Sequence, residues 1–219
     1  MKKYFFCWVL FFATWQANAQ TTGGIMPTIN FNKGLQKTNS LNLYVYDIFA
    51  GGKNVDFNNK ELYSELAFIQ MLNIHYGFTL AYAHQINNAG QKNKISENRF
   101  FQELFREDKK GKNFYKNRLR VEERFFNFKA DISNAYQTRI RYLFYYKHSG
   151  KNGFFNTYND LFYVPNANKV FSENWLYAGY AINLSKNTSL EFGALWQNFA
   201  LAAGRGNQFL FQPTLNKKF

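Results

Sequence analysis

Charged side chains recur at every second position in two stretches of the chain. The first stretch carries Arg118, Arg120, Glu122 and Arg124, and the second carries Arg139 and Arg141. Most residues between them are apolar, among them Leu119, Val121 and Ile140. Successive side chains of a β-strand point to opposite faces, so each stretch predicts a strand with one charged and one apolar face. Guanidinium and carboxylate groups on neighbouring strands can pair with one another or attract an anion.

A further acidic position extends this charged set. Glu191 lies between Leu190 and Phe192 in another alternating segment. The candidate lumen residues are therefore Arg118, Arg120, Glu122, Arg124, Arg139, Arg141 and Glu191, with Glu103 and Asp160 as plausible additions. We interpret them as a structural network of ion pairs, because an unpaired buried arginine is costly. An anion-attracting constriction is the alternative, since arginines outnumber acids on these faces.

No arrangement of residues predicts catalysis, a metal or a cofactor. His75, His84 and His148 are scattered, and no serine–histidine–acid or metal-ligand spacing is readable around them. We therefore expect no enzyme activity. If the protein does act on envelope lipids as a membrane-embedded enzyme, His84 near the rim is the residue to suspect.

The composition narrows the class of protein. The 219 residues include 27 Lys and Arg against 14 Asp and Glu, a formal net charge of +13, and 21% are aromatic. Such aromatic content argues against a disordered chain. The single cysteine, Cys7, excludes a disulfide scaffold and a metal–thiolate site. Export argues against nucleic acid as the partner of the basic charge, which suits anionic lipid head groups instead.

The first nineteen residues have the pattern of a secretory signal peptide. Lys2 and Lys3 precede an apolar run too short to span a bilayer, and Ala17 and Ala19 form a small-x-small cleavage pattern. We expect cleavage after Ala19. The remaining chain has no apolar run long enough for a transmembrane helix.

The rest of the chain alternates between apolar and polar residues in segments of roughly ten residues, the length of a membrane-spanning strand. Short separators at 72–74, 108–112, 148–152 and 185–187 alternate with longer ones at 50–60, 86–95, 127–134, 165–170 and 200–205. The strands between them are 40–50, 61–71, 74–85, 96–107, 113–126, 135–147, 153–164, 171–184, 188–199 and 206–219. Aromatic side chains dominate the apolar faces, and Gly, Ala, Arg and Glu the opposite faces. This arrangement predicts an all-β, antiparallel, up-and-down transmembrane β-barrel of ten strands over residues 40–219.

Residues 20–39 are left over. They favour a periplasmic or lumen segment, with both ends of an even-numbered barrel on the periplasmic side. A further strand around 26–32 with a missed partner would instead give twelve strands.

The final strand predicts a signal for assembly. Phe209, Phe211 and Phe219 share a parity, and Phe219 ends the sequence given. By resemblance to outer-membrane barrels, these residues look like the signal that the barrel-assembly machinery reads.

Several motifs from position 97 onward carry a family resemblance. They are Glu97-Asn98-Arg99, Gln102-Glu103, Asn117-Arg118-Leu119-Arg120, Glu122-Glu123-Arg124-Phe125, Arg139-Ile140-Arg141-Tyr142, Tyr158-Asn159-Asp160-Leu161-Phe162, Glu173-Asn174-Trp175-Leu176-Tyr177-Ala178-Gly179-Tyr180 and Leu190-Glu191-Phe192-Gly193. In them the chain resembles a domain-of-unknown-function family of small outer-membrane β-barrels of Gram-negative bacteria. Trp175 and Asp160 stand where the family usually has Arg and Glu. The resemblance implies a membrane barrel and no particular activity.

The sequence therefore predicts an outer-membrane β-barrel that is structural or forms a narrow, porin-like pore with a polar Arg/Glu lumen. Its expected partners are outer-membrane lipids and the barrel-assembly machinery. Two alternatives remain: the lipid enzyme above, and a secreted soluble β-sandwich that binds a glycan or a partner.

Overall fold

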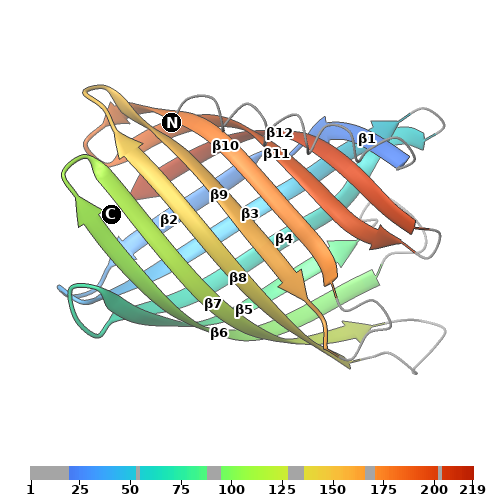
Figure 1. Cartoon of the computed structure of the whole chain (residues 1–219), viewed down its shortest axis with the longest axis horizontal. Helices are drawn as coiled ribbons and strands as arrows, with labels where there is room; N and C mark the ends of the chain where they lie inside the picture. Colours follow the sequence, from blue (N-terminus) through green and yellow to red (C-terminus); the bar gives the residue numbers. More distant parts are fainter. Residues whose placement is uncertain (1–19, 53–54, 88–94, 128–135, 166–170, 202–203) are drawn as a thin grey trace, which may run out of the picture.

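A computed structural model describes residues 20–52, 55–87, 95–127, 136–165, 171–201 and 204–219. The predicted signal peptide, 1–19, lies outside these residues. The strands are β1 (Gln20–Ile25), β2 (Thr28–Gly34), β3 (Asn39–Gly52), β4 (Val55–Met71), β5 (Tyr76–Asn87), β6 (Ile95–Lys110), β7 (Asn113–Asn127), β8 (Tyr136–Ser149), β9 (Gly153–Tyr163), β10 (Phe171–Ser185), β11 (Thr188–Leu201) and β12 (Gly204–Lys218). They form one sheet that closes on itself (Figure 1).

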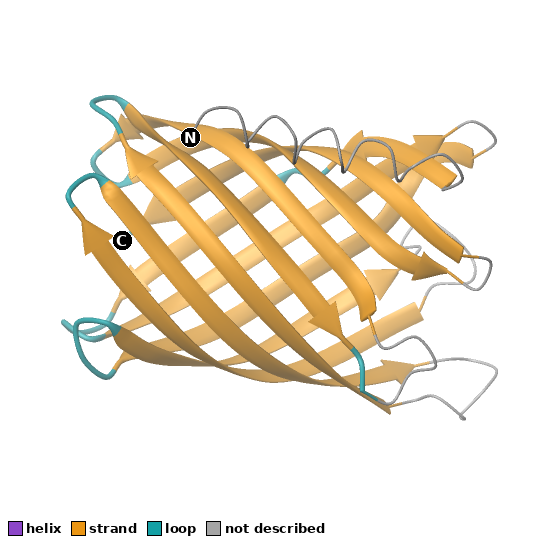
Figure 2. Ribbon diagram, in the orientation of Figure 1, coloured by secondary structure: helices purple, strands orange, loops and turns teal. Residues whose placement is uncertain are grey.

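The predicted antiparallel barrel is confirmed from β3 to β12. Each strand in this range pairs antiparallel with the next along the chain, and the ten strands correspond to the ten segments expected from the sequence. The short turns at 35–38, 72–75, 111–112, 150–152 and 186–187 lie at one end of the barrel (Figure 2). The other ends of these strands lie at the opposite end of the barrel, which we call the end of the long connections. Among the described residues, no helix is long and apolar enough to cross a membrane.

The N-terminal segment lies in the barrel wall, so the favoured periplasmic or lumen segment is wrong. Both β1 and β2 fill the seam between β3 and β12, antiparallel to the first and parallel to the second. They lie end to end, separated only by Met26 and Pro27. Gly24 is needed in this seam, because a Cβ there would lie 2.1 Å from the carbonyl oxygen of Phe49. There are twelve strand segments, but they occupy eleven positions around the wall.

This seam also overturns the expectation that both ends of the chain lie together. Because β1 and β2 pair parallel with β12, an odd number of strand positions can close the barrel. The first and last strands therefore run in the same direction. Gln20 in β1 consequently lies at the end of the long connections, whereas Phe219 lies at the end of the short turns (Figure 1). The count of ten missed this because it assumed that every neighbour is antiparallel.

The outer face of the barrel is apolar and exposed, as the alternation predicts. Leu104 on β6 is 64% exposed, Phe100 on the same strand 55%, and Leu66 on β4 55%. Side chains of the opposite parity are mostly buried inside. The strands form a single closed sheet, so the two-sheet β-sandwich considered as an alternative is wrong.

The expectation that aromatic rings face outward holds only in part. The side chains of Tyr46, Tyr63, Phe101, Phe105, Phe162 and Tyr177 are all at most 5% exposed and lie on the inner face. Guanidinium and carboxylate groups alone would leave gaps in the lumen. Rings fill that space and give the charged groups apolar surface to pack on.

Candidate functional site: the charged lumen

A closed ring of ion pairs lies on the inner face of the neighbouring strands β6 to β9. It alternates basic and acidic side chains in the order Glu103, Arg120, Glu122, Arg141, Asp160 and Arg118, and Arg118 returns to Glu103 at 3.3 Å. Three arginines and three carboxylates make this six-residue ion-pair ring neutral. β7 contributes three members because Arg118, Arg120 and Glu122 alternate along one face of it.

Glu122 is the most connected acid of the ion-pair ring. Its carboxylate is fully buried and accepts from Arg120 at 3.3 Å, from Arg141 at 3.1 Å and from Arg139. A buried carboxylate is stable only when such charged partners replace the water that it loses. Glu122 therefore links β7 to the neighbouring strand β8 on the inner face.

A second group of ion pairs lies toward the long connections. Glu97 on β6 accepts from Arg99 on the same strand and from Arg124 on β7, the latter at 2.6 Å. Arg99 also donates to Gln85 on β5. Arg139 reaches Glu173 on β10 at 3.7 Å. Glu65 on β4 also pairs with Arg120, at 3.5 Å, so the network, with Gln85 included, spans the seven strands from β4 to β10.

Aromatic rings lie beneath several of these cations. The guanidinium of Arg120 lies 3.7 Å from the ring centroid of Phe101, and that of Arg141 lies 4.2 Å from the centroid of Phe162. Arg99 lies 5.4 Å from Tyr63. Each contact adds cation–π attraction where water is scarce. The inward rings therefore support the arginines.

The opposite part of the lumen is lined by tyrosines. Tyr46 on β3 stacks on Tyr63 of β4 with ring centroids 4.8 Å apart, and Tyr158 on β9 stacks on Tyr177 of β10 at 4.9 Å. The hydroxyl of Tyr46 donates to Glu61, and that of Tyr177 to Glu191. We call the set Tyr44, Tyr46, Tyr63, Tyr158 and Tyr177 the tyrosine wall.

Small residues make room for this wall. A Cβ on Gly193 of β11 would lie 2.2 Å from the Tyr177 hydroxyl oxygen, so only glycine fits beneath that ring. Gly193 shares the parity of Glu191, but nothing in the sequence indicated the ring that covers it.

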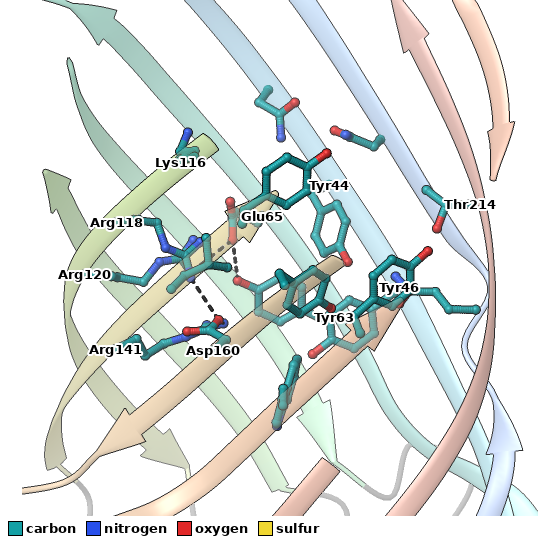
Figure 3. A pocket seen from close by; sticks show the side chains of 18 of the residues that line it. Tyr44, Tyr46, Tyr63, Glu65, Lys116, Arg118, Arg120, Arg141, Asp160 and Thr214 are labelled. Atoms are coloured by element: carbon teal, nitrogen blue, oxygen red, sulfur yellow. Dashed lines mark hydrogen bonds and ion pairs between the residues drawn. The ribbon is translucent and has the colours of Figure 1, made fainter. Parts of the chain in front are cut away.

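A cavity of about 480 Å³ lies between the ionic network and the tyrosine wall. Figure 3 shows Arg118, Arg120, Arg141 and Asp160 on one side of it, with Tyr44, Tyr46 and Tyr63 on the other. A second cavity of about 270 Å³ is lined by Lys60 and Gln208 among others. Glu61, Glu173 and Trp175 line both cavities, so these three side chains form the partition between them.

The structure places all seven sequence-predicted lumen residues on the inner side. Six belong to the ionic network: Arg118, Arg120, Glu122, Arg124, Arg139 and Arg141. Glu191 lies apart from them and accepts instead from Tyr177 and from Asn156 at 3.0 Å. Glu103 and Asp160 join the ion-pair ring as anticipated.

Arginines outnumber acids at the selected positions, but they do not on the inner face of the described strands as a whole. Four carboxylates outside the candidate set lie on the inner face as well: Glu61, Glu65, Glu97 and Glu173. The spacing of Glu97 and Arg99, two residues apart, was a readable signal of one such pair. Tyr44 and Tyr46 share a parity on β3 and were a readable signal of the tyrosine wall, but we expected aromatic side chains on the outward faces.

The histidines do not gather into a site. His84 lies on the outward parity of β5, with Nδ1 2.9 Å from Oδ1 of Asn98. His75 lies at a short turn, 3.1 Å from Asp108, and His148 contacts Asn113. In the described part of the chain, no cluster of three or more His, Cys, Asp or Glu side chains could hold a metal ion.

Comparison with known proteins gives a family but no activity. Residues 30–209 match the model of a family described as "Protein of unknown function (DUF2490)". The chain belongs to this family. The match extends well beyond the region in which motifs were recognised, since it begins at β2 rather than at β6. No curated protein and no solved structure matches this family member.

Proposed function

We propose that this protein is an outer-membrane β-barrel whose lumen is closed by its own ion pairs, so that it acts as a structural barrel or as a very narrow pore. The observation that carries the proposal is the distribution of side chains between the two faces. Large apolar groups are exposed outside, and charged groups such as Glu97, Glu122 and Arg139 are at most 3% exposed inside. Water would favour the reverse arrangement, whereas hydrocarbon favours this one.

Aromatic rings near the two ends of the outer face support a membrane span. Tyr82, Phe100, Phe125 and Tyr136 form a chain of ring contacts across β5 to β8 near the long connections. Tyr115 and Tyr146 contact each other near the short turns. Ten residues separate Tyr115 from Phe125 on β7. At about 3.3 Å per residue and a tilt of about 40°, that distance covers roughly 25 Å of depth, the height of the apolar band in such barrels.

The C-terminal strand supports recognition by the assembly machinery. Phe209, Phe211 and Phe219 are all exposed on the outer face, at 49%, 50% and 62%. Their rings therefore share one outward face of the C-terminal strand. A truncation of Phe219 that leaves assembly in cells unaffected would remove this part of the proposal.

Fractionation tests the membrane location. We expect the protein in the outer membrane after a carbonate wash, and we expect boiled and unboiled samples to migrate differently on gels. A water-soluble monomer that needs no detergent would contradict the proposal. The closed lumen predicts little or no conductance of the folded protein in a planar bilayer, and a large, stable conductance would exclude closure by the ion pairs.

An enzyme acting on envelope lipids is the second candidate. One observation favours it: His84 lies on the outer face next to Asn98, which also accepts from Tyr82 in the chain of rings near the long connections. That level corresponds to the lipid head groups. This candidate predicts that His84→Ala changes the lipid profile of the cell envelope. An unchanged profile would exclude the lipid enzyme in favour of the closed barrel.

A further inference from the structure

The larger cavity has the size and setting of a binding chamber. Its volume of about 480 Å³ lies within the roughly 300–1,000 Å³ typical of small-molecule sites. Asn42, Asn30 and Asn216 line it within four residues of the short-turn ends of β3, β2 and β12. The chamber therefore extends from the middle of the barrel toward the end with the short turns.

Its charges do not favour an anion. Every arginine that lines the cavity has a carboxylate within 4 Å, and Lys116 pairs with Glu107 at 3.0 Å. The ion-pair ring itself is neutral. An incoming anion would have to displace a carboxylate that already holds the guanidinium groups.

Two carboxylates on the other side of the cavity have no cationic partner among the described residues. Glu61 accepts from Tyr46, and Glu191 accepts from Tyr177, Asn156 and Asn216. Neither forms an ion pair within 4 Å in the described ranges. An ionised carboxylate accepts about four hydrogen bonds, so Glu61 in particular has room for further donors. Hydroxyl groups are neutral donors of this kind.

The tyrosine wall adds flat apolar surface beside these acceptors. Tyr44 and Tyr158 line the cavity with their rings, and Asn42 and Gln212 add amide groups. Ring faces accept the C–H faces of a sugar ring while the surrounding polar groups bind its hydroxyls. We propose that the chamber binds a small uncharged polyhydroxylated solute of mono- or disaccharide size. This inference goes beyond the membrane location and does not require the solute to cross the barrel.

Tryptophan fluorescence gives a direct test. Trp175 lines the chamber and its Nε1 donates to Glu173 at 2.9 Å, whereas Trp196 contacts Asn207 near the seam. In the chain from Gln20 onward, Trp196→Phe leaves Trp175 as the reporter. The protein would be folded in detergent and titrated with glucose and maltose, with glucuronate as the anionic probe and spermidine as the cationic probe.

We expect a saturable change of Trp175 emission with glucose or maltose, and weaker responses to the two charged probes. Tyr44→Phe should weaken the apparent affinity about five- to tenfold, the loss of one hydrogen bond. Tyr180→Phe on the outer face, where Tyr180 is 51% exposed, is the matched control and should change nothing.

The absence of a saturable response to both sugars would overturn the proposal, and so would tighter binding of glucuronate or spermidine. Equal weakening by Tyr44→Phe and Tyr180→Phe would also overturn it, because the effect would then not belong to the chamber. Migration of the same sample on gels with and without boiling reports the folded barrel separately, so failure of sugar binding is distinct from failure of the membrane proposal.

Discussion

The two sides of the lumen bury polar groups by different means. From β6 to β9, the buried groups are ionised and satisfy one another in a closed, neutral ion-pair ring. From β3 to β4 and from β9 to β10, stacked tyrosines bring neutral hydroxyls to isolated carboxylates. Removal of one partner from the first side leaves several charges unpaired. Removal of one partner from the second side leaves a single carboxylate without a donor. The comparison predicts a graded set of effects.

The largest effect is expected at Glu122. Glu122→Gln removes the charge that three arginines share, and loss of one partner from a buried ion pair costs about 3–5 kcal/mol. The measurement is the free energy of unfolding in urea, in lipid vesicles. Glu123→Gln is the control, because Glu123 is the neighbouring acid on the outward parity of β7. If both variants lose the same free energy, Glu122 is not the centre of the network.

A smaller effect is expected on the tyrosine wall. Tyr177→Phe leaves Glu191 without its phenol donor, and a hydrogen bond to a charged group contributes about 1.5–3 kcal/mol. Asn156 and Asn216 still donate to Glu191, which limits the loss. The same urea titration checks it, with Tyr180→Phe from the outer face of β10 for comparison. A loss larger than that of Glu122→Gln would reverse the order of the two sides.

The rings beneath the arginines come next. Phe101→Leu removes the ring 3.7 Å from Arg120 and should cost roughly 1–2 kcal/mol, the range of a desolvated cation–π contact. Phe100→Leu changes the adjacent ring on the outer face and should cost less. Equal losses in the urea titration would show that ring packing, and not attraction to Arg120, accounts for the effect.

The smallest effect is expected from salt. Buried pairs are screened much less than exposed ones, so raising the salt from about 0.1 M to about 1 M should leave the urea midpoint nearly unchanged. The ion pair of Arg106 and Asp108 lies near a short turn and contributes little to stability, so screening it by salt changes the urea midpoint little. A steep fall of the midpoint with salt would mean that water and ions reach the ion-pair ring.

The fold was largely predictable because its main signal is local. Alternation on β7 and β8 gave both the strands and the inward direction of Arg120, Glu122 and Arg141. The seam was not predictable, because the parallel pairing of β1 and β2 with β12 depends on how the barrel closes. The inward direction of several rings was not predictable for a related reason. Phe101 and Phe162 are as apolar as outward rings, and only the arginines packed on them distinguish their face.

The ion-pair ring could be predicted only as a set of residues. Arg118 and Asp160 are far apart in sequence, and their contact depends on the tilt and stagger of β7 to β9. The carboxylates Glu65 and Glu173 likewise reach their arginines across the lumen rather than along a strand.

The direction of the two faces is tested most directly by a pair of adjacent positions on β3. Asn42 lines the larger cavity, and Leu43 is 40% exposed on the outer face. Asn42→Cys and Leu43→Cys, made separately in the chain from Gln20 onward, would each carry an environment-sensitive fluorophore, attached before folding into vesicles that contain brominated lipids. We predict strong quenching by the lipid bromines at position 43 and little at position 42. Equal quenching at both positions, or stronger quenching at 42, would contradict a barrel with its apolar face in the bilayer and its ion pairs inside.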